Sequence, residues 1–221
     1  MDTFDINYNT SKNYWSNTPA SLDGMLGGFA KLTIPDIKES NVFLKNLFKM
    51  KNGPSNLRAL DCGAGIGRIS KQLLTKHFTY VDLLEQDKKF VEKAQIILQG
   101  TNVVNFYCAS LQDFSPNNNI KYDVIWIQWV LGYITNEDLI KFLKKCCMLL
   151  NKNGVIVIKE NISSSEEGDV DAIDSSVTRS IDSFCNIYQE ANLKCITRKT
   201  QQNFPKGMYK VETFALQPII K

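Results

Sequence analysis

Short apolar runs alternate with amphipathic stretches along most of this chain. Seven runs have the length of strands, and the run 122–130 is apolar almost throughout, as in a parallel strand buried on both faces. In the stretch 88–98, Phe90, Val91 and Ala94 recur at helical spacing while the lysines face outward. The alternation predicts an α/β fold with a doubly wound, seven-stranded, mostly parallel sheet. The predicted strands are 57–60, 80–85, 105–108, 122–130, 155–161, 194–200 and 209–216.

The residues up to about position 50 precede the first predicted strand, so they cannot belong to its βαβ framework. We expect them to form a helical lid beside a Rossmann-like core over 57–221, within a single domain over 1–221. A glycine-rich loop at 22–29 is placed to close over a ligand, although its apolar residues would equally serve to pack the segment onto the core. The other predicted helices are 37–50, 67–76, 88–98, 136–150 and 176–191.

A glycine-rich turn, Asp61-Cys62-Gly63-Ala64-Gly65-Ile66-Gly67-Arg68, follows the first strand and precedes a helix. Three glycines in five residues let the backbone approach a ligand closely, whereas a tight turn without a ligand rarely needs so many. The third glycine comes one residue earlier than in a dinucleotide-binding turn. This spacing resembles the signature of S-adenosylmethionine-dependent methyltransferases. Glu85 ends the second strand, where an acid either binds ribose hydroxyls or is simply solvated.

Composition and charge exclude several classes of protein. The chain of 221 residues has a net charge of +3 with scattered lysines, so nucleic acid is not an expected partner. No apolar run approaches the ~20 residues of a membrane span, and the N-terminus lacks the features of a secretory signal. We therefore expect a monomer in the cytoplasm or nucleus that does not bind membranes. Six cysteines without metal-ligand spacing and one histidine predict no metal site.

The segment 163–174 is polar and strongly acidic, and it follows the fifth predicted strand. Gln128, Trp129 and Asn161 lie at the ends of the fourth and fifth strands, on the edge where open α/β sheets bind ligands. Carboxylates concentrated beside such a site suit a cationic substrate, either an amine or a peptide with basic residues. The alternative is that the acidic segment is a solvated loop.

Several motifs together resemble the eukaryotic protein α-N-terminal methyltransferases, and the resemblance covers essentially the whole chain. The most diagnostic motif is Asp123-Val124-Ile125-Trp126-Ile127-Gln128-Trp129-Val130. The others are Tyr14-Trp15, Asp23-Gly24-Met25-Leu26-Gly27-Gly28, the glycine-rich turn, Leu111-Gln112-Asp113-Phe114, Ile156-Val157-Ile158-Lys159-Glu160-Asn161 and Asp174-Ser175-Ser176. The resemblance implies methyl transfer from S-adenosylmethionine, which becomes S-adenosylhomocysteine, to the α-amine of proteins that begin X-Pro-Lys once the initiator methionine is gone.

The resemblance also implies the residues of the cofactor site. Gly63 and Arg68 would contact the methionine part of the cofactor, with Arg68 paired to its carboxylate. Glu85 would hold the ribose, although an aspartate is frequent in the family at this position, and Gln128 would lie near the methyl donor. The remaining implied cofactor residues are Gly65, Gln86, Asp87, Leu111 and Gln112, the last two on the adenine side.

On the substrate side, the resemblance implies that Trp129 packs against the proline ring and that Asn161 hydrogen-bonds the first residue. Asp171 and Ser176 would receive the lysine ammonium. Asp174 would face the α-amine, whose pKa near 7.7–8.0 leaves most of it protonated at neutral pH and in need of a proton acceptor. Leu26, Gly27, Ile37 and Tyr209 would line the mouth of the site, with Tyr14 and Trp15 on the lid.

Besides Glu85, a second and more consequential position departs from the family pattern. Tyr133 stands where the family has a histidine that shares the handling of the proton, and a phenol with a pKa near 10 is a poor base at neutral pH. The implied catalytic residues are Asp174, as the proton acceptor, and Asn161, together with Tyr133, whose contribution the sequence leaves open. Two other functions also stay open: a methyltransferase for a small amine or metabolite, and a non-catalytic binder of basic N-terminal tails.

Overall fold

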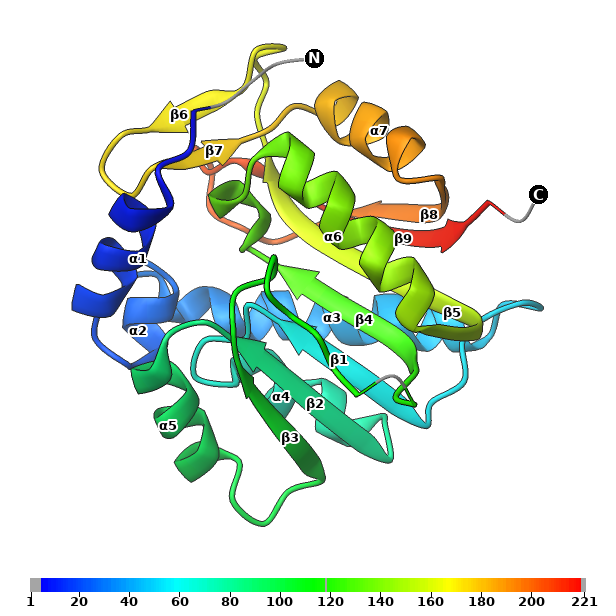
Figure 1. The fold of residues 1–221 in the computed structure, drawn as a ribbon. Coiled ribbons are helices and arrows are strands. Elements are labelled where there is room, and N and C mark those ends of the chain that lie inside the picture. The colour runs from blue at the N-terminus through cyan, green and yellow to red at the C-terminus, as the bar shows by residue number, and fades with distance from the viewer. Residues whose placement is uncertain (1–4, 118, 220–221) are drawn as a thin grey trace.

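The main sheet has the predicted doubly wound arrangement. In this computed structural model, which describes residues 5–117 and 119–219, seven strands form one sheet in the order β3-β2-β1-β4-β5-β9-β8 (Figure 1). β1 to β5 are parallel, and β9 runs antiparallel between β5 and β8. The strand order reverses between β1 and β4, where open sheets of this kind bind ligands. The strands are β1 (Arg58–Cys62), β2 (Tyr80–Glu85), β3 (Val103–Cys108), β4 (Tyr122–Gln128), β5 (Leu150–Ile162), β8 (Leu193–Thr200) and β9 (Lys210–Pro218).

Alternate residues of the central strands pack on opposite faces of the sheet. Val124 and Trp126 pack with residues of α3 and α4, whereas Ile125 and Ile127 pack with residues of α6 and α7. Because both faces are covered, the strands carry almost continuous apolar sequence, and the predicted fold class is confirmed. The helices are α3 (Thr33–Phe48), α4 (Arg68–Gln72), α5 (Lys88–Ile97), α6 (Asn136–Leu149) and α7 (Ile181–Glu190), with short 3-10 turns η1 (Ala30–Leu32), η2 (Leu74–Lys76) and η3 (Leu131–Tyr133).

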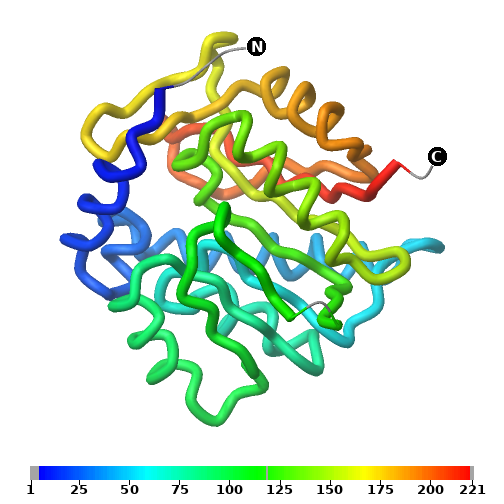
Figure 2. Tube along the Cα trace, in the orientation of Figure 1, coloured from blue at the N-terminus to red at the C-terminus, as the bar shows by residue number. Residues whose placement is uncertain are grey.

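Two N-terminal helices, α1 (Tyr8–Asn17) and α2 (Leu22–Met25), lie beside the carboxyl ends of the strands (Figures 1 and 2). Lys89 of α5 anchors the end of α1, because its ammonium donates to the carbonyl oxygens of Ser16 at 2.7 Å and Thr18 at 2.6 Å. Ser11 anchors the middle of α1, since its hydroxyl donates to the Asp174 carbonyl at 2.8 Å. The N-terminal segment therefore bridges two parts of the core that are far apart in sequence.

The predicted helix 176–191 is wrong in its first turn. Ser176–Thr178 forms β7, which pairs antiparallel with β6 (Asp169–Asp171) as a small hairpin, and α7 begins at Ile181 with the hydroxyl of Ser180 capping the amide of Ser183. Val177 is buried in the hairpin, so its packing overrides the helical periodicity that follows. The predicted helix 67–76 is also divided, into α4 and η2.

Among the described residues, no helix combines the length and the apolar character needed to cross a membrane.

Candidate functional site

Two cavities of about 500 Å³ each meet at the carboxyl edge of the sheet. The strand-end cavity lies over the ends of β1, β2 and β4, and its walls include Gly63, Glu85 and Leu111. The hairpin cavity lies beside β5 and β7, and its walls include Asn161 and Asp174. The two cavities share four side chains: Trp15, Met25, Trp129 and Tyr133. A ligand in one cavity can therefore approach a ligand in the other across this common wall.

The glycine-rich turn forms the floor of the strand-end cavity. Gly63 has a φ of 65°, and a Cβ added there would lie 2.5 Å from a Val130 methyl carbon, so a side chain is excluded by both conformation and space. Asp61 lies buried beneath the turn and accepts from the amide and hydroxyl of Ser70 at 2.9 and 2.7 Å. Burial raises the pKa of Asp61 to about 6. Asp61 therefore joins the turn to the start of α4.

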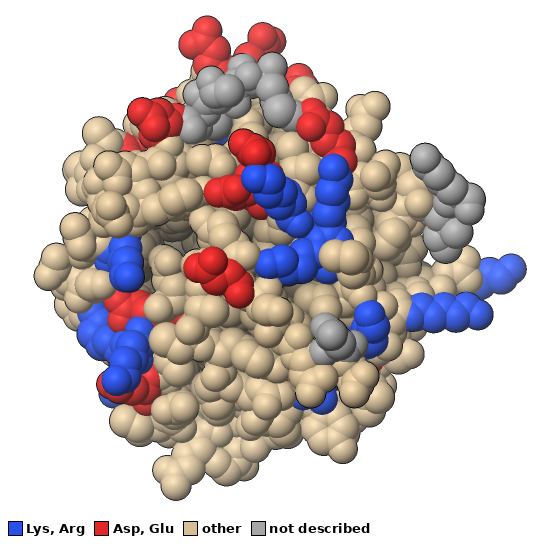
Figure 3. Space-filling model, viewed as in Figure 1, with Lys and Arg blue, Asp and Glu red and all other residues tan. Residues whose placement is uncertain are grey.

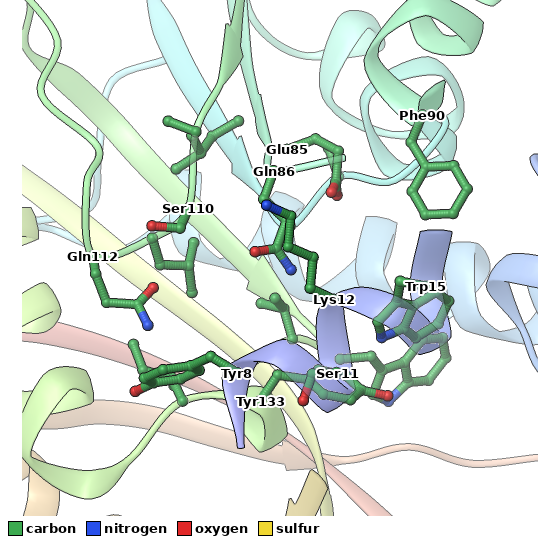
Figure 4. Close-up of a pocket in the computed structure, with 18 of the residues that line it drawn as sticks. Tyr8, Ser11, Lys12, Trp15, Glu85, Gln86, Phe90, Ser110, Gln112 and Tyr133 are labelled. Carbon is green, nitrogen blue, oxygen red and sulfur yellow. The ribbon is translucent and has the colours of Figure 1, made fainter. Parts of the chain in front are cut away.

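Glu85 presents a buried carboxylate at the end of β2. Its Oε2 accepts from the Gly65 amide and its Oε1 from the Asp87 amide, both at 2.9 Å. Burial raises the pKa of Glu85, and these two amides offset part of that rise. Each oxygen keeps a further lone pair that can accept from a hydroxyl group. Figure 4 shows Glu85 and Gln86 across the cavity from Tyr8, Ser11 and Trp15 of α1, so the lid segment closes the side opposite the strand end.

A buried ionic cluster that the sequence reading missed lies behind the strand-end cavity. The carboxylate of Asp36, in α3, accepts from Arg68 Nη1 and from Lys159 Nζ, both at 2.5 Å. It also accepts from Gln128 Nε2 at 3.0 Å. All four side chains are buried. Although burial alone would raise it, the two cations hold the pKa of Asp36 below its ordinary value. The one sequence signal was a lysine in an apolar strand, which needs a buried partner.

In this cluster two cations share one directly paired carboxylate, while the carboxylates of Asp61 and Glu39 act on Arg68 and Lys159 from a greater distance. Arg68 also lines the strand-end cavity, and its guanidinium carbon lies 5.3 Å from the centre of the Trp129 ring. Among the described residues only Nη1 of Arg68 is in an ion pair, so its remaining N–H groups can donate to an anionic ligand group. The cavity therefore fits a ligand that combines a carboxylate, held at Arg68, with hydroxyl groups that donate to Glu85. S-adenosylmethionine has both features.

Asp174 forms the polar centre of the hairpin cavity. Its Oδ2 accepts from the Tyr133 hydroxyl at 2.7 Å, and its Oδ1 accepts from the Ser176 amide at 3.0 Å. Burial and the neighbouring Asp174 raise the pKa of Tyr133 well above its ordinary value. The phenol therefore stays protonated at neutral pH and donates to Asp174. The ring of Trp15 packs edge-on against Tyr133, with centroids 5.7 Å apart.

Trp129 separates the two cavities. It is a non-glycine residue with a positive φ, 54°, and its indole nitrogen is buried with no hydrogen-bond partner among the described residues. Asn161, at the end of β5, lines the hairpin cavity beside it. Both residues face the cavity that also contains Asp174, so an aromatic wall, an amide and a carboxylate lie around one space.

The structure brings most of the predicted site residues to these two cavities. Of the predicted cofactor residues, the strand-end cavity is lined by Gly63, Arg68, Glu85, Gln86, Leu111, Gln112 and Gln128. Of the predicted substrate and catalytic residues, the hairpin cavity is lined by Tyr14, Trp15, Leu26, Gly27, Trp129, Tyr133, Asn161, Asp174, Ser176 and Tyr209. The side-chain amide of Gln128 already forms hydrogen bonds to residues behind the cavity. Its oxygen accepts from the Trp126 indole at 3.0 Å, and its nitrogen donates to Asp36.

Four predicted residues line neither cavity. Gly65 acts through its amide on Glu85, and Asp87 caps α5 and accepts from the Ser16 hydroxyl at 2.9 Å. Ile37 is a residue of α3 and packs against the hydrophobic core. Leu32, five residues earlier, lines the hairpin cavity instead. Asp171 is exposed at the end of β6, on the acidic hairpin whose carboxylates gather over the top of the molecule in Figure 3.

Comparisons with known proteins agree with this geometry. Residues 4–217 match the family described as AdoMet dependent proline di-methyltransferase. The chain is 42% identical over 214 residues to the N-terminal Xaa-Pro-Lys N-methyltransferase 1 of Xenopus tropicalis, covering 95% of each protein. It is 41% identical over 219 residues to the alpha N-terminal protein methyltransferase 1 of Drosophila melanogaster, covering 97% of this chain and 77% of that protein.

Solved structures are similar as well. A SAM-dependent methyltransferase from Leishmania major superposes with a TM-score of 0.89 at 37% identity, covering 95% of this chain and 82% of that one. A S-adenosylmethionine-dependent methyltransferase from Clostridium acetobutylicum has a TM-score of 0.67 at 12% identity and covers 90% of this chain and 96% of that one, which shows that the fold is shared.

Proposed function

Because the chain belongs to the AdoMet-dependent proline di-methyltransferase family, we propose that it transfers methyl groups from S-adenosylmethionine to the α-amine of proteins that begin X-Pro-Lys. The observation that carries the proposal is the junction of the two cavities. On one side lies the guanidinium of Arg68, and on the other lies the carboxylate of Asp174, with Trp129 and Tyr133 between them.

Residues of the strand-end cavity would hold the cofactor. Arg68 would pair with its carboxylate, since the guanidinium lines this cavity and only its Nη1 is paired with Asp36. Glu85 would accept from its ribose hydroxyls, and Leu111 and Gln112 would lie at its adenine. When bound, S-adenosylmethionine supplies an electrophilic methyl group. The enzyme has to align the acceptor amine with that group and to manage the proton of the amine.

Asp174 would manage that proton. Most of an α-amine with a pKa near 7.7–8.0 is protonated at neutral pH, so an adjacent carboxylate can bind the ammonium and accept a proton from it. The Tyr133 hydroxyl donates to Oδ2 of Asp174 and the Ser176 amide donates to Oδ1, which fixes the plane of the carboxylate. Tyr133 acts as a donor to Asp174, because burial and this carboxylate keep its pKa high.

The hairpin cavity would bind the first residues of the substrate. Trp129 would pack against the proline ring, and Asn161 would hydrogen-bond the first residue. Ser176, with the nearby acidic hairpin that includes Asp171, would receive the lysine ammonium. The lid residues Tyr14 and Trp15 would cover the peptide, since both line this cavity. A neutral third residue would leave these polar groups without a partner and be disfavoured.

We further propose that the chain is a single methyltransferase domain and works as a monomer in the cytoplasm or nucleus, on protein substrates and without nucleic acid or membrane. The modest net charge of +3 supports the absence of nucleic acid.

Labelled S-adenosylmethionine tests the proposed reaction directly. The protein is incubated with an X-Pro-Lys peptide and, in parallel, with the same peptide acetylated at its N-terminus. We expect labelling of the free peptide alone, together with release of S-adenosylhomocysteine. Equal labelling of both peptides would contradict the α-amine as acceptor. Binding of the peptide without any release of S-adenosylhomocysteine would contradict a catalytic function.

A further inference from the structure

The turn that follows β4 contains a residue in a strained conformation. Trp129 has a φ of 54°, in the left-handed region that bulky side chains rarely adopt. Such a conformation persists only where the surrounding structure holds it in place. Because Trp129 lines both cavities, the contacts that hold this conformation also fix the wall that the two cavities share.

Three hydrogen bonds fix this turn to β5. The Trp129 amide donates to the Lys159 carbonyl at 3.1 Å. The next two amides, of Val130 and Leu131, both donate to Oε1 of Glu160, at 2.8 and 2.9 Å. One carboxylate oxygen thus holds two successive amides, immediately after the strained residue.

The turn held by Glu160 positions two walls of the site. Trp129 lines both cavities, and η3, which begins at Leu131, places the Tyr133 hydroxyl 2.7 Å from Asp174. The buried guanidinium of Arg179 also holds η3, because it donates to the carbonyl oxygens of Leu131 and Ile134, both at 2.5 Å. Glu160 thus holds the amides of the turn, and Arg179 holds the carbonyl oxygens of the first residue of η3 and of the residue that follows its end.

Glu160 is buried and lines the hairpin cavity. Burial raises its pKa to about 7, against the effect of the two amides and of the charge on Arg179. A carboxylate with a raised pKa that lies next to an amine substrate has two possible roles. It could hold the turn, or it could accept a proton from the substrate. The two roles predict different effects of a glutamine, which keeps the amide oxygen but cannot act as a base.

We propose that Glu160 is a positioning residue for the methyl-transfer reaction: its Oε1 holds the turn 129–131 and so sets where Trp129 and Tyr133 meet the substrate peptide. The expected effect on peptide affinity rests on the proposed function, whereas the hydrogen bonds themselves can be tested without any substrate. E160Q keeps an acceptor at Oε1. E160M fills a similar volume without a comparable acceptor, so it releases the turn.

The first test follows the turn by NMR in the protein without substrate. In the wild-type protein the Val130 and Leu131 amides should exchange with solvent at least 10³-fold more slowly than free amides. The indole N–H signal of Trp129 is assigned by its loss in W129F. In E160M this signal should shift or broaden. The indole N–H signal of Trp126, which donates a hydrogen bond to Gln128, should stay unchanged. E160Q should resemble the wild type. Fast exchange of both amides in the wild type would overturn the proposal even if E160M fails to fold.

The second test measures methylation of an X-Pro-Lys peptide. E160M should raise the KM for the peptide at least tenfold. It should raise the dissociation constant for S-adenosylhomocysteine by a smaller factor, since Trp129 and Val130 of the turn line the strand-end cavity but Glu160 itself does not. E160Q should keep both KM and kcat within about threefold. The control is E212Q, which removes the buried carboxylate opposite Glu160 on β9 and should leave the peptide KM unchanged.

Two kinetic results would overturn the proposal. An E160Q variant with an unshifted Trp129 signal and a kcat reduced about 100-fold would make Glu160 a proton acceptor. An E160M variant with the wild-type peptide KM would show that the turn does not depend on Glu160. If the wild-type protein methylates no peptide, the proposed function fails, and the NMR test still decides the role of Glu160.

Discussion

The charge of the Asp36 cluster gives a quantitative prediction for the variant D36N. The asparagine would keep the size of the side chain but remove the one carboxylate between Arg68 and Lys159. Its amide nitrogen would also face groups that can only donate hydrogen bonds. Both cations would then stay buried without their ionic partner.

The expected loss follows from the burial of the partners. Asp36 and Lys159 have no exposed surface, and Arg68 is 8% exposed. Removal of one member of a buried ion pair costs about 3–5 kcal/mol. Lys159 keeps hydrogen bonds to Ser40 at 2.9 Å and Gln201 at 2.7 Å, so we expect the lower end, about 3 kcal/mol. For a chain of this length, that corresponds to a fall in Tm of about 6–12 °C.

The pH dependence provides a second signature of the same variant. Burial already lowers the pKa of Lys159, and loss of the Asp36 carboxylate would lower it further. A lysine with a lowered pKa in the folded state binds fewer protons there than in the unfolded chain, so stability rises with pH up to the unfolded value near 10.4. The deficit of D36N relative to the wild type should therefore shrink between pH 7 and pH 10.

Calorimetry or urea unfolding at pH 7, 8.5 and 10 measures both effects. The matched control is E137Q, which removes an exposed carboxylate that pairs with Lys141 on α6 and should leave the Tm almost unchanged, since exposed ion pairs contribute little to stability. A fall in Tm below about 2 °C for D36N, or a deficit that is constant with pH, would refute the ionic account of the cluster.

Three further predictions concern the hairpin cavity. D174N should lower kcat about 100-fold with unchanged binding of S-adenosylhomocysteine, and wild-type turnover would remove Asp174 from the role of proton acceptor. Y133F should lower kcat/KM about tenfold, since one hydrogen bond to a charged group is lost, and a loss as large as that of D174N would instead give the phenol a direct part in proton transfer. Because the pKa of Glu160 is raised from 4.5 to about 7, the folded chain keeps a proton that the unfolded chain releases, so Glu160 should cost about 3 kcal/mol of stability as pH rises from 4.5 to 7. In urea unfolding, the free energy of E160Q should fall by about 3 kcal/mol less than that of the wild type between pH 4.5 and pH 7. The same pH profile for both proteins would contradict the raised pKa of Glu160.

Local sequence spacing was sufficient for the part of the site built on consecutive residues. The glycine-rich turn and Glu85 could be predicted because the ends of neighbouring parallel strands must meet at one edge of the sheet. The structure adds that Gly65 donates its amide to Glu85 at 2.9 Å, which joins the turn to the end of β2. The end of the fifth predicted strand also indicated Asn161. The resemblance to a known family supplied the role of Asp174, which spacing alone would not have selected from the acidic segment 163–174.

Contacts between distant segments could not be predicted in the same way. Asp36 and Lys159 are separated by 123 positions, and nothing in either local sequence names the other as its partner. The hairpin of β6 and β7 also escaped prediction, because the burial of Val177 depends on what covers it. Ile37 was expected at the mouth of the site, but the position of α3 directs it to the core and gives Leu32 that place.

The sequence by itself determined the alternation of strands and helices, hence the doubly wound sheet, and the place of the glycine-rich turn at its switch point. These features depend on periodicity and on backbone freedom, which are local properties. Only the tertiary structure decided that Asp36 joins Arg68 to Lys159 and that Glu160 holds the strained turn at Trp129. Such contacts arise because a buried charge or amide needs a partner wherever the fold brings one within reach.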